Sequence, residues 1–221
     1  MKKKKVNIMA DFQQIRKQIE MKDLFSILTF NILIGLFSIY AIIYCVFNFL
    51  PADAMGELSK SNGLTGQKTF AGILVAAGGA IFIAPFAEEF IFRGVLFTKF
   101  MKKLPIWTSM ILSSVLFGAI HFSISAITTF LFAISLCIVF YKTKNIAIAI
   151  ILHIFNNTFV SGMEIMSELF SKSSNEDMSL SVISTQFYTI GIPCLIISIL
   201  LAYYLIQKRD FLKLNKPFMV D

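Results

Sequence analysis

Residues 70 to 97 read FAGILVAAGGAIFIAPFAEEFIFRGVLF, an apolar stretch with only three charged side chains. The stretch is long enough to cross a bilayer as a helix, which needs about 20 apolar residues. Its charges, Glu88, Glu89 and Arg93, form the pattern E-E-x-x-x-R. A charged group at the bilayer centre costs at least about 2.5–3.5 kcal/mol, so these three residues indicate a functional site.

Two further apolar stretches carry the only two histidines of the chain. Phe117 and His121 form F-x-x-x-H, and His153 and Asn157 form H-x-x-x-N. Each pair is four residues apart, so its two side chains share one helix face. Three apolar stretches therefore carry polar motifs that are expensive in lipid.

The overall composition indicates a membrane protein. Hydrophobic residues make up 57% of the chain and charged residues 15%, whereas soluble domains have roughly 45–50% and about 25%. We expect an all-α, polytopic transmembrane helical bundle at residues 24–206, with a basic segment at 1–23 and a basic tail at 207–221. The six expected spans are Leu24–Leu50, Phe70–Phe97, Ile106–Phe122, Ser125–Tyr141, Ile146–Met166 and Val182–Leu205.

The lysines and arginines predict the orientation of the bundle. Apart from Lys60, Lys68, Lys172 and Arg93, they lie in the N-terminal segment, the loops after the second and fourth spans, and the C-terminal tail. Cytoplasmic loops carry such an excess, so both termini are expected in the cytoplasm of an integral, multi-pass protein. A nucleic-acid partner is not expected, because the positive charge is not gathered on one folded surface. The richness in Phe, Ile and Lys suggests a bacterial cell membrane.

Three local features refine this picture. Residues 8–22 alternate apolar and charged positions, which fits either an interfacial helix on the cytoplasmic leaflet or a simple polybasic tail. Residues 167–181 are polar and partly acidic, so we expect an external loop. Pro193 lies inside the last span and predicts a kink there.

The first motif divides into two carboxylates with different roles. Glu89 and Arg93 are four residues apart and can pair on one helix face, which would neutralise the arginine. Glu88 is rotated by about 100° around the helix and can face a different cavity. A carboxylate that is free of the arginine suits a general base acting on water.

The two histidine motifs supply the other parts needed to hydrolyse an amide. His153 and Asn157 offer hydrogen-bond donors that could hold a developing oxyanion. His121 could orient or polarise a water beside Glu88, and Phe117 could form a wall of the pocket.

Other readings of the same residues stay open. Glu88, His121 and His153 match the His₂Glu set of zinc peptidases, although the helical H-E-x-x-H signature is absent. We therefore expect no cofactor, with zinc as the alternative. Taken singly, Glu89–Arg93 could be a packing pair, His121 a core histidine, and His153 with Asn157 an interhelical hydrogen-bonding pair.

The ordered trio of motifs resembles the CPBP family, which comprises CAAX prenyl endopeptidases of the Rce type and bacterial Abi or bacteriocin-processing proteins. The resemblance covers residues 70–166 and implies an intramembrane endopeptidase with a glutamate-activated water. It implies Glu88 as the base, His121 as a holder of the water, and His153 and Asn157 as oxyanion donors. Glu89 and Arg93 would be structural support. Family members have also been described as metalloproteases, so the metal question stays open.

We therefore expect hydrolysis of a peptide bond in a membrane-associated peptide or protein, with bacteriocin or pheromone precursors as the natural substrates by resemblance. The alternative is a non-catalytic membrane regulator or bacteriocin-immunity protein. A small transporter is less favoured because inverted repeats are absent. Neither the substrate nor the oligomeric state follows from the sequence. One tension concerns depth: His121 lies about 24 Å along its helix from Pro105, but Glu88 only about 16 Å from Lys99.

Overall fold

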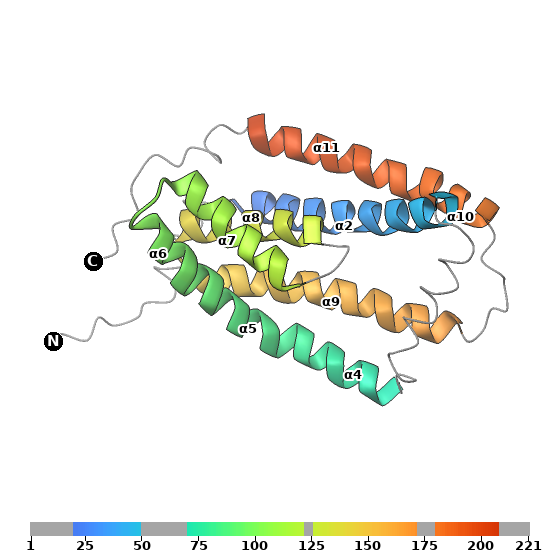
Figure 1. The fold of residues 1–221 in the computed structure, drawn as a ribbon, viewed down its shortest axis with the longest axis horizontal. Coiled ribbons are helices and arrows are strands. Elements are labelled where there is room, and N and C mark those ends of the chain that lie inside the picture. Colours follow the sequence, from blue (N-terminus) through green and yellow to red (C-terminus); the bar gives the residue numbers. More distant parts are fainter. Residues whose placement is uncertain (1–19, 50–69, 122–125, 172–179, 208–221) are drawn as a thin grey trace.

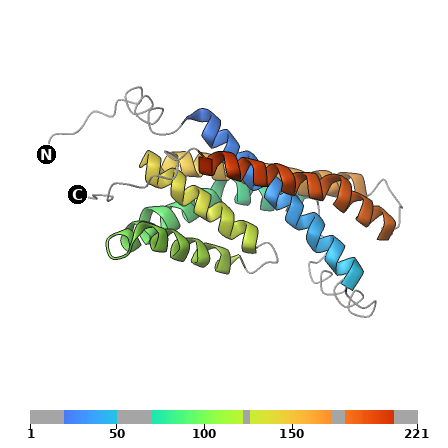
Figure 2. The same ribbon diagram turned by 90° about the horizontal axis from the view of Figure 1, so that it is seen from above.

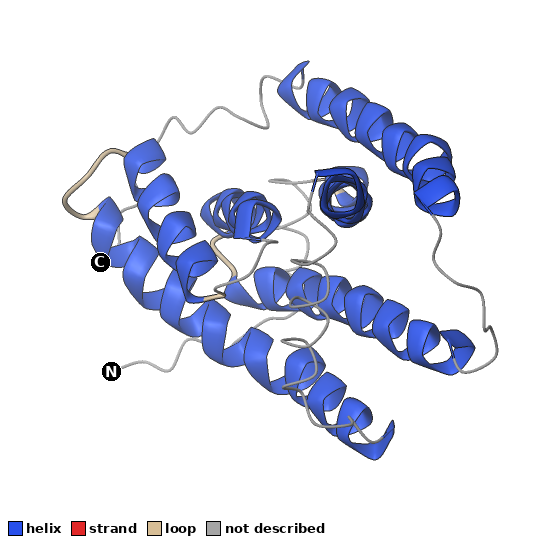
Figure 3. Cartoon of the chain, turned by 45° about the vertical axis from the view of Figure 1, so that its right-hand side comes forward, coloured by secondary structure: helices blue, strands red, loops and turns tan. Residues whose placement is uncertain are grey.

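The computed structural model describes residues 20–49, 70–121, 126–171 and 180–207, and every element in these ranges is a helix (Figure 3). The elements are α2 (Met21–Phe49), α4 (Phe70–Gly78), η1 (Gly79–Ile83), α5 (Ala84–Glu89), η2 (Phe90–Phe97), α6 (Thr98–Met101), α7 (Ile106–Ile120), α8 (Ala126–Thr143), α9 (Ile146–Ser171), α10 (Leu180–Gln186), η3 (Phe187–Gly191) and α11 (Ile192–Gln207). The predicted all-α bundle is confirmed.

Five of the described helices are long and apolar enough to cross a membrane, and they make this an integral, multi-pass membrane protein. They are Met21–Phe49, Phe70–Met101, Ala126–Thr143, Ile146–Met163 and Ser181–Gln207. The other predicted span, α7, is an apolar helix of only 15 residues. Its length is about 22 Å, which is less than the roughly 30 Å hydrocarbon core of a bilayer.

Successive helices run in alternating directions along one axis (Figure 1). Figures 1 and 2 place the start of α2, the α6–α7 turn, the α8–α9 turn and the end of α11 at the same end of the bundle. Lys22, Lys102, Lys103 and Lys144 lie at these positions. The basic residues of the described helix ends thus gather at one end of the bundle, which the charge rule assigns to the cytoplasm; the orientation stays a prediction.

Helix α8 lies at the centre of the described bundle. Half of its span is buried inside the structure, compared with 6% for α2. Helix α7 packs against one side of α8, while α9 contacts α8, α2, α5 and both π-helical segments, η1 and η2. Helix α11 packs mainly on α2. The polar motifs of α5, η2, α7 and α9 are thereby brought around α8.

The helix that carries Glu88 and Glu89 is irregular on both sides of these residues. The π-helical segment η1 precedes α5, and η2 follows it. In η1, the N–H of Ala84 donates to the carbonyl of Gly79, five residues earlier. Pro85 follows directly at the start of α5 and has no N–H to donate. Such π segments within α-helices are frequent at functional sites.

A second irregular helix runs from Leu180 to Gln207. Its π segment, η3, ends two residues before Pro193, where the sequence predicted a kink. The predicted loop at 167–181 is shorter than expected, because α9 continues to Ser171 and α10 begins at Leu180. Hydrophobic side chains at Met166 and Leu169 explain why the helix continues past the predicted boundary. The predicted interfacial helix at 8–22 lies almost wholly outside the described residues.

A tight turn between α8 and α9 fixes the start of the helix that carries His153. Lys144 has a positive φ of 51°, and its N–H donates to the carbonyl of Phe140 at 2.7 Å. This geometry is typical of a helix end with a left-handed residue. Asn145 then caps α9, because its side-chain oxygen accepts the N–H of Ala147 at 2.9 Å.

Helix α7 lies directly against α8 at Gly118, three residues before His121. A methyl group at Gly118 would lie 3.2 Å from the carbonyl oxygen of Ala126 and 3.5 Å from Cβ of Phe130. The Gly118 carbonyl also accepts the N–H of His121 at 3.2 Å. The absence of a side chain at Gly118 therefore sets both the helix spacing and the position of His121.

We expect a Gly118→Ala variant to lose about 1–3 kcal/mol of unfolding free energy, as is usual when a packed interface is overfilled. Gly162→Ala is the matched control, because nothing lies within 4 Å of the added methyl group in α9. The control should be neutral or more stable by up to about 1 kcal/mol. Denaturant unfolding in detergent micelles compares the two. Equal stability of both variants would show that the contact at Gly118 does not limit the packing.

Candidate active site

A fully buried ion pair forms the base of the site. Nη1 of Arg93 lies 3.0 Å from Oε1 of Glu89, and neither side chain is exposed. Nη2 of Arg93 donates to the carbonyl of Ala133 in α8 at 3.0 Å, and its guanidinium lies 4.6 Å from the ring centre of Phe117. The pairing predicted from the four-residue spacing is confirmed, and it connects η2 to α7 and α8.

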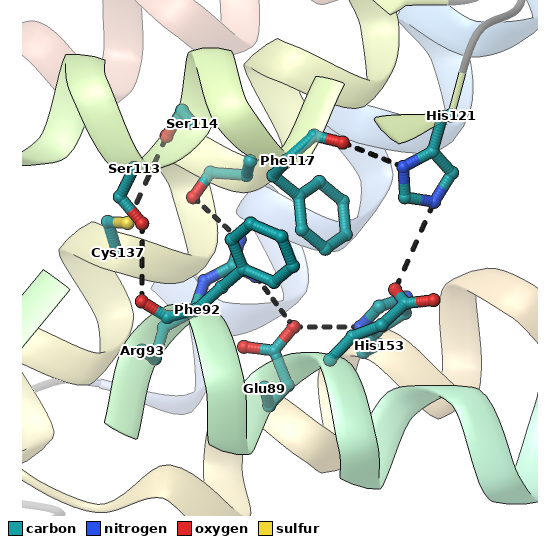
Figure 4. A network of polar contacts seen from close by, with 11 residues as sticks. Glu89, Phe92, Arg93, Ser113, Ser114, Phe117, His121, Cys137 and His153 are labelled. Atoms are coloured by element: carbon teal, nitrogen blue, oxygen red, sulfur yellow. Dashed lines mark hydrogen bonds and ion pairs between the residues drawn. The ribbon is translucent and has the colours of Figure 1, made fainter. Parts of the chain in front are cut away.

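The same carboxylate oxygen holds His153. Nδ1 of His153 lies 2.8 Å from Oε1 of Glu89 (Figure 4). When the Glu89 oxygen acts as the acceptor, as in its contact with Arg93, Nδ1 of His153 carries the hydrogen. The rings of Phe132 and Phe117 pack edge-on against His153 at centroid distances of 5.1 and 6.0 Å. The orientation of His153 is therefore fixed by one charged hydrogen bond and two aromatic walls.

His121 is held in a comparable way at the end of α7. Its Nδ1 lies 2.7 Å from the carbonyl oxygen of Phe117, one turn earlier (Figure 4). A carbonyl only accepts, so Nδ1 of His121 also carries the hydrogen. The Phe117 ring lies 4.7 Å from the imidazole, which agrees with its predicted place in the pocket wall. In both histidines, Nε2 is the nitrogen left to face the site.

Glu88 lies between the two Nε2 atoms. Its Oε2 is 3.7 Å from Nε2 of His153 and 3.9 Å from Nε2 of His121. These separations exceed a direct hydrogen bond of 2.7–3.2 Å. Oε2 of Glu88 is buried and has no hydrogen-bond partner among the described residues. Two imidazole nitrogens and one carboxylate oxygen thus lie close enough together to contact the same water molecule.

The depth of His121 matches that of Glu88 because the two helices share a hairpin. Glu88 lies 13 residues before Met101, where α6 ends, and His121 lies 15 residues after Ile106, where α7 begins. Both are therefore about 20 Å from the turn. The expected mismatch arose because Glu88 was measured from Lys99 and His121 from Pro105, whereas the helices end at Met101 and begin at Ile106.

Asn157 lies one turn beyond His153 and uses one amide hydrogen within the protein. Its Nδ2 donates to the carbonyl of Ala80 in η1 at 2.8 Å. The second hydrogen on Nδ2 has no protein acceptor among the contacts that the structure describes. The role of Asn157 as an oxyanion donor therefore stays a prediction that would depend on this second hydrogen.

The three converging atoms belong to residue types that zinc binds in proteins. The donor types fit, because ligand histidines usually donate their other N–H to a carboxylate or carbonyl, as His153 and His121 do. The arrangement does not fit. Across the described residues, no group of three or more His, Cys, Asp or Glu side chains is arranged to hold a metal ion.

Several residues of the site were not predicted from the sequence. Phe132 and Ala133 of α8 contact His153 and Arg93, although α8 has no recognisable motif. Ser113 of α7 donates to the carbonyl of Phe92 at 3.2 Å. No sequence pattern indicated these three residues. Pro85, a proline inside an expected span and three residues before Glu88, was a signal only for the irregular helix.

Residues 70–159 match the family model described as type II CAAX prenyl endopeptidase Rce1-like. The matched range includes all three polar motifs, and it agrees with the resemblance inferred from their order. No curated protein and no solved structure matches the chain at a significant level.

Proposed function

We propose that this protein hydrolyses a peptide bond of a substrate within the membrane, with Glu88 as the group that activates water. The match of residues 70–159 to the family model described as type II CAAX prenyl endopeptidase Rce1-like supports this proposal. The observation that carries the proposal is the buried oxygen of Glu88, which has no hydrogen-bond partner and lies between the Nε2 atoms of two histidines. A buried carboxylate oxygen without a partner is costly, so its retention indicates a ligand such as water.

In the proposed reaction, a water molecule bound at Glu88 attacks the carbonyl carbon of the scissile peptide bond. The bond between the water oxygen and the carbon forms while one water proton passes to Oε2 of Glu88. The electron pair of the carbonyl bond moves to its oxygen, which becomes an oxyanion. Nε2 of His121 accepts a hydrogen bond from the water and so orients it.

The charges of the site suit a donor at His153. Glu88 and Glu89 carry two negative charges, and Arg93 carries one positive charge. In the proposed step, His153 carries a hydrogen on both ring nitrogens when the oxyanion forms. Such a histidine donates to the oxyanion from Nε2, while Glu89 holds Nδ1.

The tetrahedral intermediate then breaks down, and the proton that Glu88 took from water is used in this step. The bond between carbon and nitrogen breaks, and protonated Glu88 gives its proton to the departing amine. Glu88 returns to the carboxylate and the product acid is released. Glu88 therefore acts first as a general base and then as a general acid.

The test is cleavage by the purified protein in proteoliposomes. One arm uses a farnesylated CAAX peptide, following the name of the matched family. A second arm uses membrane-associated peptides without a prenyl group, such as a bacteriocin precursor. Cleavage in either arm supports the proposal and shows which substrate class applies. A protein that cleaves in neither arm and restores a cellular phenotype as a Glu88→Gln variant would instead be a non-catalytic regulator.

We expect cleavage to be unchanged after the protein is dialysed against a zinc chelator. The reason is that the proposed step uses only Glu88, water and the two histidines. The same preparation supplemented with zinc is the control. Loss of cleavage on chelation, followed by recovery with added zinc, would show that the two histidines and Glu88 hold a metal.

A further inference from the structure

The break in the helix before Glu88 leaves one backbone carbonyl without a helical partner. The N–H of Ala84 bonds Gly79, five residues earlier. In this register the carbonyl of Ala80 would accept from residue 85. That residue is proline, which has no N–H. The side chain of Asn157 supplies the missing donor at 2.8 Å.

Two other backbone carbonyls of the same helix also accept hydrogen bonds from side chains. In η2, the carbonyl of Phe92 accepts from Ser113 at 3.2 Å, and the carbonyl of Arg93 accepts from Thr98 at 2.9 Å. In a membrane, a carbonyl that lacks its helical partner needs another donor, because lipid offers none. Asn157, like Ser113 and Thr98, therefore donates a side-chain hydrogen bond to the backbone of this irregular helix.

We infer that Asn157 is a positioning residue that acts through the Ala80 carbonyl. Asn157 lies one turn after His153 in α9, and Ala80 lies two turns before Glu88. Their bond fixes α9 to the broken helix and so sets the 3.7 Å separation of Glu88 and His153. The inference rests on the proposed function, because this separation affects a rate only if Glu88 and His153 perform the chemistry.

The experiment is a double-mutant cycle between Asn157→Leu and Pro85→Ala. Leucine has nearly the shape of asparagine but no donor, so Asn157→Leu leaves the Ala80 carbonyl unpaired. Alanine at position 85 restores the N–H that the π register assigns to Ala80. We expect Asn157→Leu to lower kcat about 10- to 100-fold in the native background, with KM unchanged. In the Pro85→Ala background, we expect it to lower kcat by less than about threefold.

A direct role of Asn157 at the oxyanion gives a different result. The loss in kcat would then be the same in both backgrounds, and this outcome overturns the inference. Thr158→Val is the matched control, because Thr158 donates only to Ile154 of its own helix at 2.7 Å. In each background, this control is expected to leave the kcat and KM of that background unchanged.

Thermal unfolding of the same four proteins separates this inference from the proposed function. Asn157→Leu should lower the Tm in the native background and leave it nearly unchanged beside Pro85→Ala. The comparison of Tm values needs no protease activity. It therefore shows whether the hydrogen bond between Asn157 and Ala80 contributes to stability, even if the protein cleaves neither class of peptide. Pro85→Ser restores the same N–H and replaces Pro85→Ala if the latter does not accumulate. An equal fall in Tm in both backgrounds would contradict the bond between Asn157 and Ala80.

Discussion

A Glu88→Gln variant is expected to lose cleavage by about 100- to 10,000-fold, the usual contribution of a general acid–base group. Glutamine keeps the shape of the side chain but cannot take a proton from water. The fold should stay intact, because Oε2 of Glu88 has no hydrogen-bond partner in the described protein that the substitution could break. The measurement is the rate of peptide cleavage in proteoliposomes, with the thermal unfolding of each protein recorded in parallel.

The neighbouring residue supplies the control for this prediction. Glu89→Gln removes a carboxylate of the same size, but one that is fully buried against Arg93 and His153. Glu89→Gln should therefore lower the Tm as well as the activity, whereas Glu88→Gln should lower activity alone. Wild-type cleavage by Glu88→Gln would exclude Glu88 as the base.

The largest effect on stability is expected for Arg93→Met. Arg93 is fully buried and contacts Glu89, the Ala133 carbonyl and the Phe117 ring. Methionine has no charge to balance Glu89. Removal of one partner of a buried ion pair typically costs about 3–5 kcal/mol, because the other charge stays buried without compensation. The free energy of unfolding, measured with denaturant in micelles, should fall by this amount.

Removal of the second charge should restore much of this loss. In the double variant Arg93→Met with Glu89→Gln, no net charge is buried, and the glutamine oxygen still accepts from Nδ1 of His153. The double variant should be more stable than Arg93→Met alone. Its cleavage should stay low, because Glu89 no longer balances a doubly protonated His153. If the double variant were less stable than Arg93→Met, Glu89 would contribute mainly through contacts other than Arg93.

The helical elements followed from the sequence because lipid leaves few alternatives. Apolar runs such as 70–97 and 146–166 predict helices since each backbone group must be bonded within its own segment. The ends were less predictable. Thr98–Met101 and residues 167–171 extend the helices past the point where the apolar run weakens. The extension to Met101 also explains the depth of His121.

The site was predictable only where it depends on local spacing. The contact of Glu89 with Arg93 follows from a separation of four residues on one helix. The contact of Glu89 with His153 joins residues 64 positions apart, and no spacing rule indicates it. The bond from Asn157 to Ala80 depends on a π register at Pro85, and hydrophobic periodicity does not reveal that register. The catalytic roles of Glu88, His121, His153 and Asn157 stay predictions.

The shortness of α7 has a consequence for the lipid beside it. A helix about 22 Å long leaves roughly 8 Å of a 30 Å hydrocarbon core unmatched. A bilayer accommodates such a helix by thinning, by snorkelling of flanking side chains or by association of copies. Thinning would bring the headgroup layer and its water closer to His121, at the end of α7. The surrounding lipid would then help to supply the water that a hydrolytic reaction consumes.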